Sequence, residues 1–120
     1  MNRRSFFLAP FLLMNLTNIA QSAETKLSHD EIQSHLNGAV VVHRSGGKTA
    51  FRQSFSHDGT TTYKAEGRDT ELGKWSIQGN QYCSKWGPFG WTCYDMTAEG
   101  NLITWIAKDG ARFPGKMIKE

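Results

Sequence analysis

The part of this 120-residue chain best equipped for recognition chemistry is a short aromatic run. Trp86, Phe89 and Trp91 lie within six residues that also contain glycine and proline, and Cys83 and Cys93 bracket them. Aromatic faces bind sugar rings, bases or the apolar pocket of a partner, and a loop pinned by a disulfide loses little entropy on binding. The three aromatic residues are therefore candidate ligand-binding residues.

The same rings have a second interpretation, in which they fold inward and plug one end of a barrel. This interpretation is favoured, because large aromatic side chains fill cores more often than they form sites. Replacing Phe89 and Trp91 by Ser separates the two: a plug loses melting temperature, whereas an exposed loop does not.

The two cysteines have two chemistries open to them, a disulfide and a metal site. An oxidising compartment favours a disulfide between Cys83 and Cys93, which closes a loop of about ten residues and contributes roughly 2–3 kcal/mol. Zinc needs two further ligands, and the histidines lie far upstream at unrelated spacings. These are His29, His35, His43 and His57. We predict the disulfide and no metal site.

No catalytic constellation is recognisable. His57-Asp58 precedes Gly59 in a turn signal, and adjacent residues of an extended chain point apart. A G-x-S-x-G element, a lone catalytic cysteine and a c-type haem motif are all missing, and the carboxylates show no distinctive pairing. Gly87-x-x-Gly90 lacks the Lys-Ser/Thr element and the helix of a phosphate loop. We therefore expect a protein that is not an enzyme and has no cofactor.

The first 22 residues have the layout of a secretory signal peptide. Arg3 and Arg4 precede an apolar run over residues 6–16, and Ala20-Gln21-Ser22 is a small-x-small cleavage signal. Removing this segment lowers the formal net charge from +3 to +1, because 12 basic side chains then face 11 acidic ones. We expect a periplasmic or secreted protein that neither binds nucleic acid nor stays inserted in a membrane after cleavage.

One helix is predicted in the remaining single domain, residues 23–120. Ser28 and Glu31 form a capping box, and Leu27 and Ile32 stand where a hydrophobic staple places them. With Gly38 as the C-terminal signal, the helix covers residues 29–36. It is too short to be stable alone, so it must dock on the sheet.

The rest of the chain predicts a mainly β fold: an antiparallel meander of about eight short strands that forms a small barrel or a sandwich. Glycine-containing turn signals separate the strands. The predicted strands are 39–44, 49–56, 60–66, 72–78, 81–86, 92–98, 102–107 and 112–118.

Hairpin geometry extends the prediction to register. A two-residue Gly79-Asn80 loop pairs Ile77 with Tyr82 and Trp75 with Ser84. Because side chains alternate between the faces of a sheet, the core is expected on one face. Its members would be Trp75, Ile77, Tyr82, Trp86, Tyr94, Met96, Ile103 and Trp105.

The same rule applied to Glu99-Gly100 pairs Met96 with Ile103 and Tyr94 with Trp105. A two-residue loop at Asp109-Gly110 then leaves several apolar groups on the outer face. These are the cystine, Leu102, Ile106 and Phe113.

The helix stripe is predicted to cover that outer face with Ile32 and Leu36. Pro114 cannot donate to a β-ladder, so the last strand is expected to be an edge strand or to end near it.

Several short motifs together resemble an uncharacterised family of small proteobacterial exported proteins, domain of unknown function 995. They are L-S-x-x-E-I in the helix, D-G-T, G-x-W, and Y-C-S-x-W followed by C-Y. In this chain they fall on Leu27, Ser28, Glu31, Ile32, Asp58–Thr60, Gly73–Trp75, Tyr82, Cys83, Ser84, Trp86, Cys93 and Tyr94. The resemblance implies a bacterial envelope location and a β-rich fold, and it supplies no activity and no catalytic residues.

A second stretch, Asp109 to Phe113, is similar to the S-G-x-x-Y loop of periplasmic lysozyme inhibitors, although only Gly110 matches and a type I′ hairpin turn accounts for the segment. We expect a non-enzymatic binding or interaction module of the bacterial envelope. Its partner would be a glycan, a small apolar ligand or an envelope protein. The alternative is an inhibitor of a cell-wall hydrolase that inserts a hairpin carrying Arg112 and Phe113 into a cleft.

Overall fold

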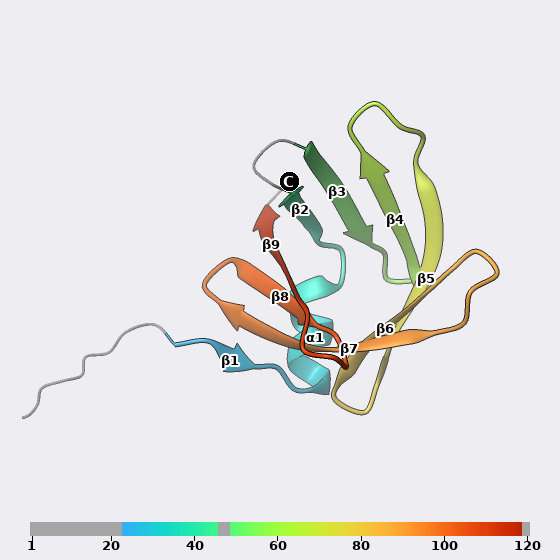
Figure 1. Cartoon of the computed structure of the whole chain (residues 1–120). Helices are drawn as coiled ribbons and strands as arrows, with labels where there is room; N and C mark the ends of the chain where they lie inside the picture. Colours follow the sequence, from blue (N-terminus) through green and yellow to red (C-terminus); the bar gives the residue numbers. More distant parts are fainter. Residues whose placement is uncertain (1–22, 46–48, 119–120) are drawn as a thin grey trace, which may run out of the picture.

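The computed structural model describes residues 23–45 and 49–118 and contains nine strands and one helix in that part of the chain (Figure 1). In chain order the elements are β1 (Thr25–Lys26), α1 (His29–Leu36), β2 (Val40–Ser45), β3 (Thr49–Phe55), β4 (Thr60–Ala65), β5 (Glu71–Gln78), β6 (Gln81–Trp86), β7 (Thr92–Glu99), β8 (Leu102–Ile106) and β9 (Arg112–Ile118). The helix and the eight predicted strands agree with the sequence to within one residue at each end, while β1 is not predicted. The predicted signal peptide and the glycine turn signal expected between the strands 39–44 and 49–56 lie outside the described residues.

Eight of the strands form a closed antiparallel barrel. Each strand from β2 to β8 pairs with the next, and β9 returns to pair with β2. The closing ladder runs from Val40 opposite Ile118 to Val42 opposite Lys116. The short β1 lies beside the far end of β7. Of the two predicted architectures, the barrel is confirmed and the sandwich is wrong.

The helix begins where its capping chemistry predicts. The Ser28 side chain accepts a hydrogen bond from the Glu31 N–H, and the Glu31 carboxylate accepts one from the Ser28 N–H at 2.8 Å. That second hydrogen bond lowers the pKa of Glu31. Leu27 and Ile32 are both buried, as the hydrophobic staple requires.

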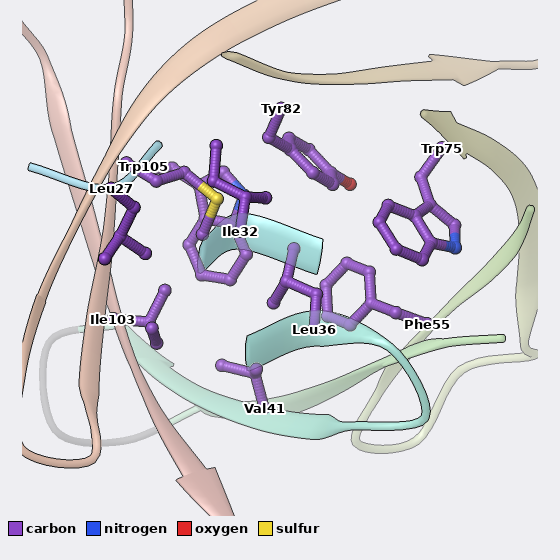
Figure 2. Packing of buried hydrophobic residues seen from close by; sticks show 10 residues of the cluster. Leu27, Ile32, Leu36, Val41, Phe55, Trp75, Tyr82, Ile103 and Trp105 are labelled. Carbon is purple, nitrogen blue, oxygen red and sulfur yellow. The ribbon is translucent and has the colours of Figure 1, made fainter. Parts of the chain in front are cut away.

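The position of the helix differs from the prediction, because α1 closes one end of the barrel instead of covering an outer face. The His29 N–H donates to the Asn80 side chain at 2.8 Å, and the Gly38 N–H donates to the Phe55 carbonyl at 2.7 Å. These contacts tie the helix to the β5–β6 hairpin and to the end of β3. Ile32 and Leu36 are completely buried among interior side chains (Figure 2). An open barrel end offers a narrow apolar stripe more burial than a flat sheet face does.

The core combines this helix stripe with inward-facing side chains of the strands (Figure 2). Of the predicted core, Trp75, Tyr82, Met96, Ile103 and Trp105 are buried, and Ile77 and Tyr94 are partly buried and pack against them. The sequence interpretation missed Val41 and Phe55, which are almost completely buried. The Phe55 ring makes edge contacts with Trp75 and Tyr82 at centroid distances of 5.7 and 5.9 Å.

Two of the three predicted hairpin registers put every side chain on the correct face of the sheet. Across Gly79-Asn80 the predicted pairs are confirmed, including Ile77 with Tyr82. Between β7 and β8 the prediction is wrong by two residues, since Met96 pairs with Trp105 because the loop residues are Gly100 and Asn101. A shift of two preserves the face of each side chain, so the predicted core survived this error.

The β8–β9 register is wrong by one residue, which has a larger effect. Trp105 pairs with Phe113 across a three-residue loop in which the Gly110 N–H donates to the Ala107 carbonyl. Gly110 has φ +93°, the left-handed geometry of a bulge that follows a tight turn. The predicted type I′ turn is therefore replaced by an odd-numbered loop. Phe113 consequently lies on the inner face and not on the outer one.

Pro114 marks the point at which barrel closure weakens. It lies in the middle of β9, opposite Thr104 of β8, and the ladder to β2 extends only as far as Lys116. The prediction of an edge strand or a strand end is therefore wrong for the whole of β9. The prediction holds only for the side of β9 that faces β2, where the ladder ends before Pro114 and no N–H is required of the proline.

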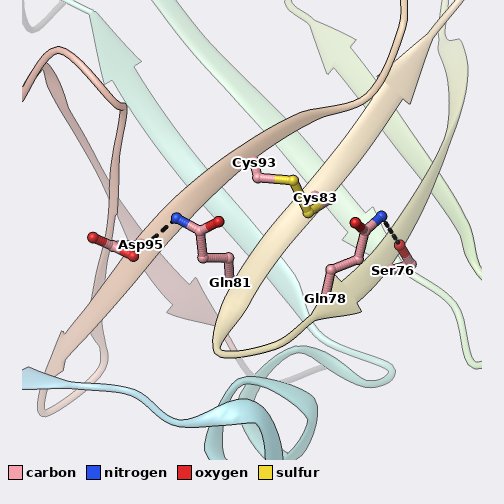
Figure 3. The surroundings of a disulfide bond; sticks show 6 residues. All are labelled: Ser76, Gln78, Gln81, Cys83, Cys93 and Asp95. Carbon is pink, nitrogen blue, oxygen red and sulfur yellow. Dashed lines mark hydrogen bonds between the residues drawn. A yellow bond between two sulfur atoms is a disulfide. The ribbon is translucent and has the colours of Figure 1, made fainter.

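The predicted disulfide is present and joins Cys83 of β6 to Cys93 of β7, which stand directly opposite one another (Figure 3). Beside it on the outer face, Gln81 donates to Asp95 at 3.1 Å, and Gln78 donates to Ser76. Leu102 and Ile106 also lie on the outer face, as predicted, with Ile106 near Cys93. The prediction is wrong for Phe113, which faces the cavity, and for the cover, because α1 does not lie on this face.

Candidate functional site

A cavity of about 230 Å³ lies inside the barrel at the end opposite α1. Every barrel strand except β5 contributes a side chain to it. Most of its wall is aromatic: Phe51, Tyr63, Trp86, Tyr94, Trp105 and Phe113. Phe113 is 48% exposed, so the cavity reaches the surface beside the start of β9.

Contacts between rings hold the wall together. Phe51 and Tyr63 lie on adjacent strands with centroids 4.8 Å apart, and Tyr63 meets the edge of Trp86 at 6.2 Å. On the other side, Tyr94 makes an edge contact with Phe113 at 6.3 Å. Strand alternation puts all these rings on the inner face of the barrel. Because the rings pack against one another, they stay along the wall of the cavity.

One polar group deep in the cavity is already satisfied by its neighbours. Gln53 donates from Nε2 to the hydroxyl of Tyr82 and to that of Thr61, both at 3.3 Å. Ser84 also hydrogen-bonds with Tyr82, and Thr61 donates to the Ser54 carbonyl at 2.8 Å. Burial raises the pKa of Tyr82 well above its ordinary value, so its phenol stays protonated. This cluster gives the inner end of the cavity a closed hydrogen-bond network.

Two other polar atoms in the wall have no partner in the described part of the chain. They are Nε2 of His43 and the indole Nε1 of Trp105, both buried. Each belongs to a residue that lines the cavity. Buried polar atoms are nearly always hydrogen-bonded, so these two are unusual and leave one acceptor and one donor of the wall without a partner.

His43 is held firmly in the wall. Its ring stacks on Phe51 with centroids 4.8 Å apart and planes 11° apart, and it meets Trp105 at 5.2 Å. Nδ1 lies 3.1 Å from the carbonyl oxygen of Pro114. Because a carbonyl only accepts, Nδ1 carries the proton and Nε2 is left as an acceptor. Burial lowers the pKa of His43, so the ring is neutral at neutral pH.

The three predicted ligand-binding residues lie in different surroundings. Trp86 is half-buried in the cavity wall, where its ring covers the backbone of Gly73. Phe89 and Trp91 are 72% and 44% exposed. The favoured interpretation, that the loop folds inward as a plug, is therefore wrong. The barrel is closed instead by α1 at its other end, so the loop rings are not needed in the core.

The sequence interpretation missed most of the cavity. Phe51 and Gln53 alternate with outward residues along β3, a local signal for an inner face. No local signal identifies His43, because its role depends on Pro114, which is 71 residues away along the chain.

Two other predicted elements have simpler explanations. The Asp58 carboxylate accepts a hydrogen bond from the Thr60 N–H at 3.0 Å, which lowers the pKa of Asp58 and favours the turn interpretation of this segment. In the hairpin that resembles an inhibitor loop, Arg112 forms an ion pair with Glu24, and Phe113 faces the cavity. Both side chains of that hairpin are thus engaged within the protein itself.

Residues 23–45 and 49–118 contain no helix that is long and apolar enough to cross a membrane. They also contain no group of three or more histidine, cysteine or carboxylate side chains positioned for a metal ion. Comparison with protein-family models, with curated proteins and with solved structures finds no match. What the cavity can bind therefore has to follow from its own residues.

Proposed function

We propose that this protein is a non-enzymatic binding module that takes one small, mainly apolar ring compound into the open end of its barrel. The observation that carries the proposal is the aromatic cavity at the end opposite α1. Small-molecule sites are typically concave and lined by aromatic side chains with a few polar groups, and eight-stranded barrels of this kind hold one small ligand.

The size of the cavity supports a single ring. A cavity of about 150 Å³ suffices for a benzene-sized molecule, so about 230 Å³ leaves room for one ring with a small substituent. A ligand of about seven or eight heavy atoms, at roughly 0.6 kcal/mol per atom, binds with a Kd of about 0.3–1 mM. A natural ligand that extends out past Phe113 would bind more tightly.

The composition of the wall supports binding without chemistry. The titratable side chains that line the described cavity are His43 and three tyrosines, and no carboxylate, amine or thiol is among them. Burial keeps His43 neutral, and Tyr82 is engaged with Ser84 and Gln53. Nucleophilic catalysis needs a nucleophile activated by an adjacent base, and in the described wall none of the ring or hydrogen-bond contacts of His43 is with a serine, cysteine or lysine.

We place the module in the periplasm or outside the cell. The predicted leader and the Cys83–Cys93 disulfide support this location. Of the three predicted ligand-binding residues, Trp86 forms part of the cavity wall, whereas Phe89 and Trp91 lie on the exposed loop that follows β6.

The two tryptophans of the loop provide a matched test. Toluene and phenol are titrated into the wild-type protein, Trp86→Ala and Trp91→Ala, with binding followed by protein NMR shifts and stability by urea unfolding. We expect binding to weaken at least fivefold in Trp86→Ala and to stay unchanged in Trp91→Ala. Binding that survives the first change and disappears with the second would place the ligand on the outer loop and overturn the proposal.

A further inference from the structure

We propose that His43 selects the ligand: its Nε2 accepts a hydrogen bond from a hydroxyl or ring N–H, so the occupant is an uncharged ring compound of the phenol class. This inference rests on the proposed function and specifies its ligand. The carrying observation is a buried acceptor without a partner on a side chain that lines an otherwise aromatic cavity.

The first step is the fixed position of the imidazole. Only 7% of His43 is exposed, and its ring is stacked on Phe51. A Cβ added to Gly115 would lie 2.8 Å from Cε1 and 3.0 Å from Nδ1, so this edge of the ring rests on the backbone of β9. With Nδ1 committed to the Pro114 carbonyl, Nε2 is the one polar atom that the ring leaves for another molecule.

The second step is the sign of the hydrogen bond. A neutral imidazole protonated on Nδ1 offers a lone pair on Nε2, which binds a donor and repels an anion. The nearby Trp105 Nε1–H is buried and also unpartnered, and an indole N–H can only donate. The two atoms therefore call for one donor and one acceptor, and a hydroxyl group has both.

The third step excludes ligands richer in polar groups. Of the other polar side chains of the cavity, Gln53 and Ser84 already bond with Tyr82, and the remaining polar groups are the hydroxyls of Tyr63 and Tyr94. A monosaccharide would bury several hydroxyls against mainly aromatic faces that offer few groups to bond with them. A cation would find no carboxylate among the described lining residues. A ring with one hydroxyl-like substituent matches the inventory best.

The experiment compares three small rings of similar size: phenol, which donates and accepts, anisole, which only accepts, and toluene, which does neither. Each is titrated into the wild-type protein and into His43→Phe, which keeps a flat ring next to Phe51 and removes the acceptor. We expect the ratio of the toluene Kd to the phenol Kd to fall about tenfold in His43→Phe. Anisole can accept from the Trp105 N–H but cannot donate to His43, so the ratio of the toluene Kd to the anisole Kd should be the same in both proteins.

A second readout needs no variant and decides the matter should His43→Phe fail to fold. The ¹⁵N resonance of His43 Nε2 in the wild-type protein should move when phenol binds and stay in place when toluene binds. Equal behaviour of the two rings at Nε2, an unchanged Kd ratio, or tighter binding of a methyl glucoside than of phenol overturns the assignment of ligand class. In the first two cases ring binding itself would still stand, whereas failure of phenol, anisole and toluene alike would overturn the proposed function as well.

Discussion

Gly115 is the residue on which the geometry around His43 most directly depends. Gly115 is buried in β9, directly before Lys116, the last residue of β9 that pairs with β2. A Cβ placed on Gly115 would lie 2.5 Å from Cγ1 of Val41. Ordinary carbon contacts are about 3.5–4.0 Å, so a methyl group at this position requires a shift of about 1 Å. We predict that Gly115→Ala lowers the free energy of unfolding by about 1–3 kcal/mol, the usual effect of overpacking.

The contact with Val41 allows a double-mutant cycle. Val41→Ala removes the methyl group that the new side chain would strike, and by itself should destabilise the protein by about 2–3 kcal/mol. In the double variant the two changes compensate, so we expect it to be more stable than additivity predicts by about 1 kcal/mol or more. Urea unfolding followed by tryptophan fluorescence measures all four proteins.

Gly90→Ala is the matched control. Gly90 lies in the loop after β6, and a Cβ placed there meets nothing within 4 Å. Its replacement should change the stability by no more than about 0.5 kcal/mol. The packing described around His43 is refuted if Gly115→Ala is as stable as Gly90→Ala, or if the costs of Gly115→Ala and Val41→Ala simply add.

Three further changes test the disulfide, the helix and the buried histidine. Replacing Cys83 and Cys93 together by Ala should cost roughly 2–3 kcal/mol in urea unfolding, and an unchanged midpoint would count against the disulfide. Ile32→Ala should lower the free energy of unfolding by about 2–5 kcal/mol, whereas Gln33→Ala, at an exposed neighbouring position, should lower it by less than about 0.5 kcal/mol. Equal effects would contradict the conclusion that α1 closes one end of the barrel. Because burial lowers the pKa of folded His43, the unfolded chain binds a proton more readily as pH falls below about 6.5, so stability should decline between about pH 7.5 and 5. This decline should be smaller in His43→Phe, and identical pH profiles would refute the assignment.

Local signals account for how much of the fold could be predicted. The capping box at Ser28 and the Gly79-Asn80 hairpin each specify backbone geometry through residues within four positions of one another, and both are confirmed. Strand boundaries follow from the same kind of signal. What these signals do not contain is the destination of the helix, because Ile32 and Leu36 would be buried equally well by any apolar surface of the right width.

The Asp-Gly loops show why the site was harder to predict than the fold. At both 58–59 and 109–110 the aspartate accepts a hydrogen bond from the N–H two residues on, and the glycine has a positive φ of 90° or 93°. Both are three-residue loops in this structure, but Asp-Gly also forms two-residue loops, and the two kinds differ by one residue in register. That single residue decides whether Phe113 faces solvent or the cavity.

The cavity exists because one plug fills only part of the barrel. The interior of an eight-stranded barrel is nearly filled by its own side chains, so a helix that inserts Ile32 and Leu36 at one end makes that end a solid core. The rings of Phe55 and Tyr82 pack on this core and form the boundary. Beyond them no further element enters within the described residues, and strand alternation continues to place side chains inward. The aromatic side chains there contact one another around the wall and leave the cavity between them. The cavity therefore remains because α1 is short and fills only one end of the barrel interior.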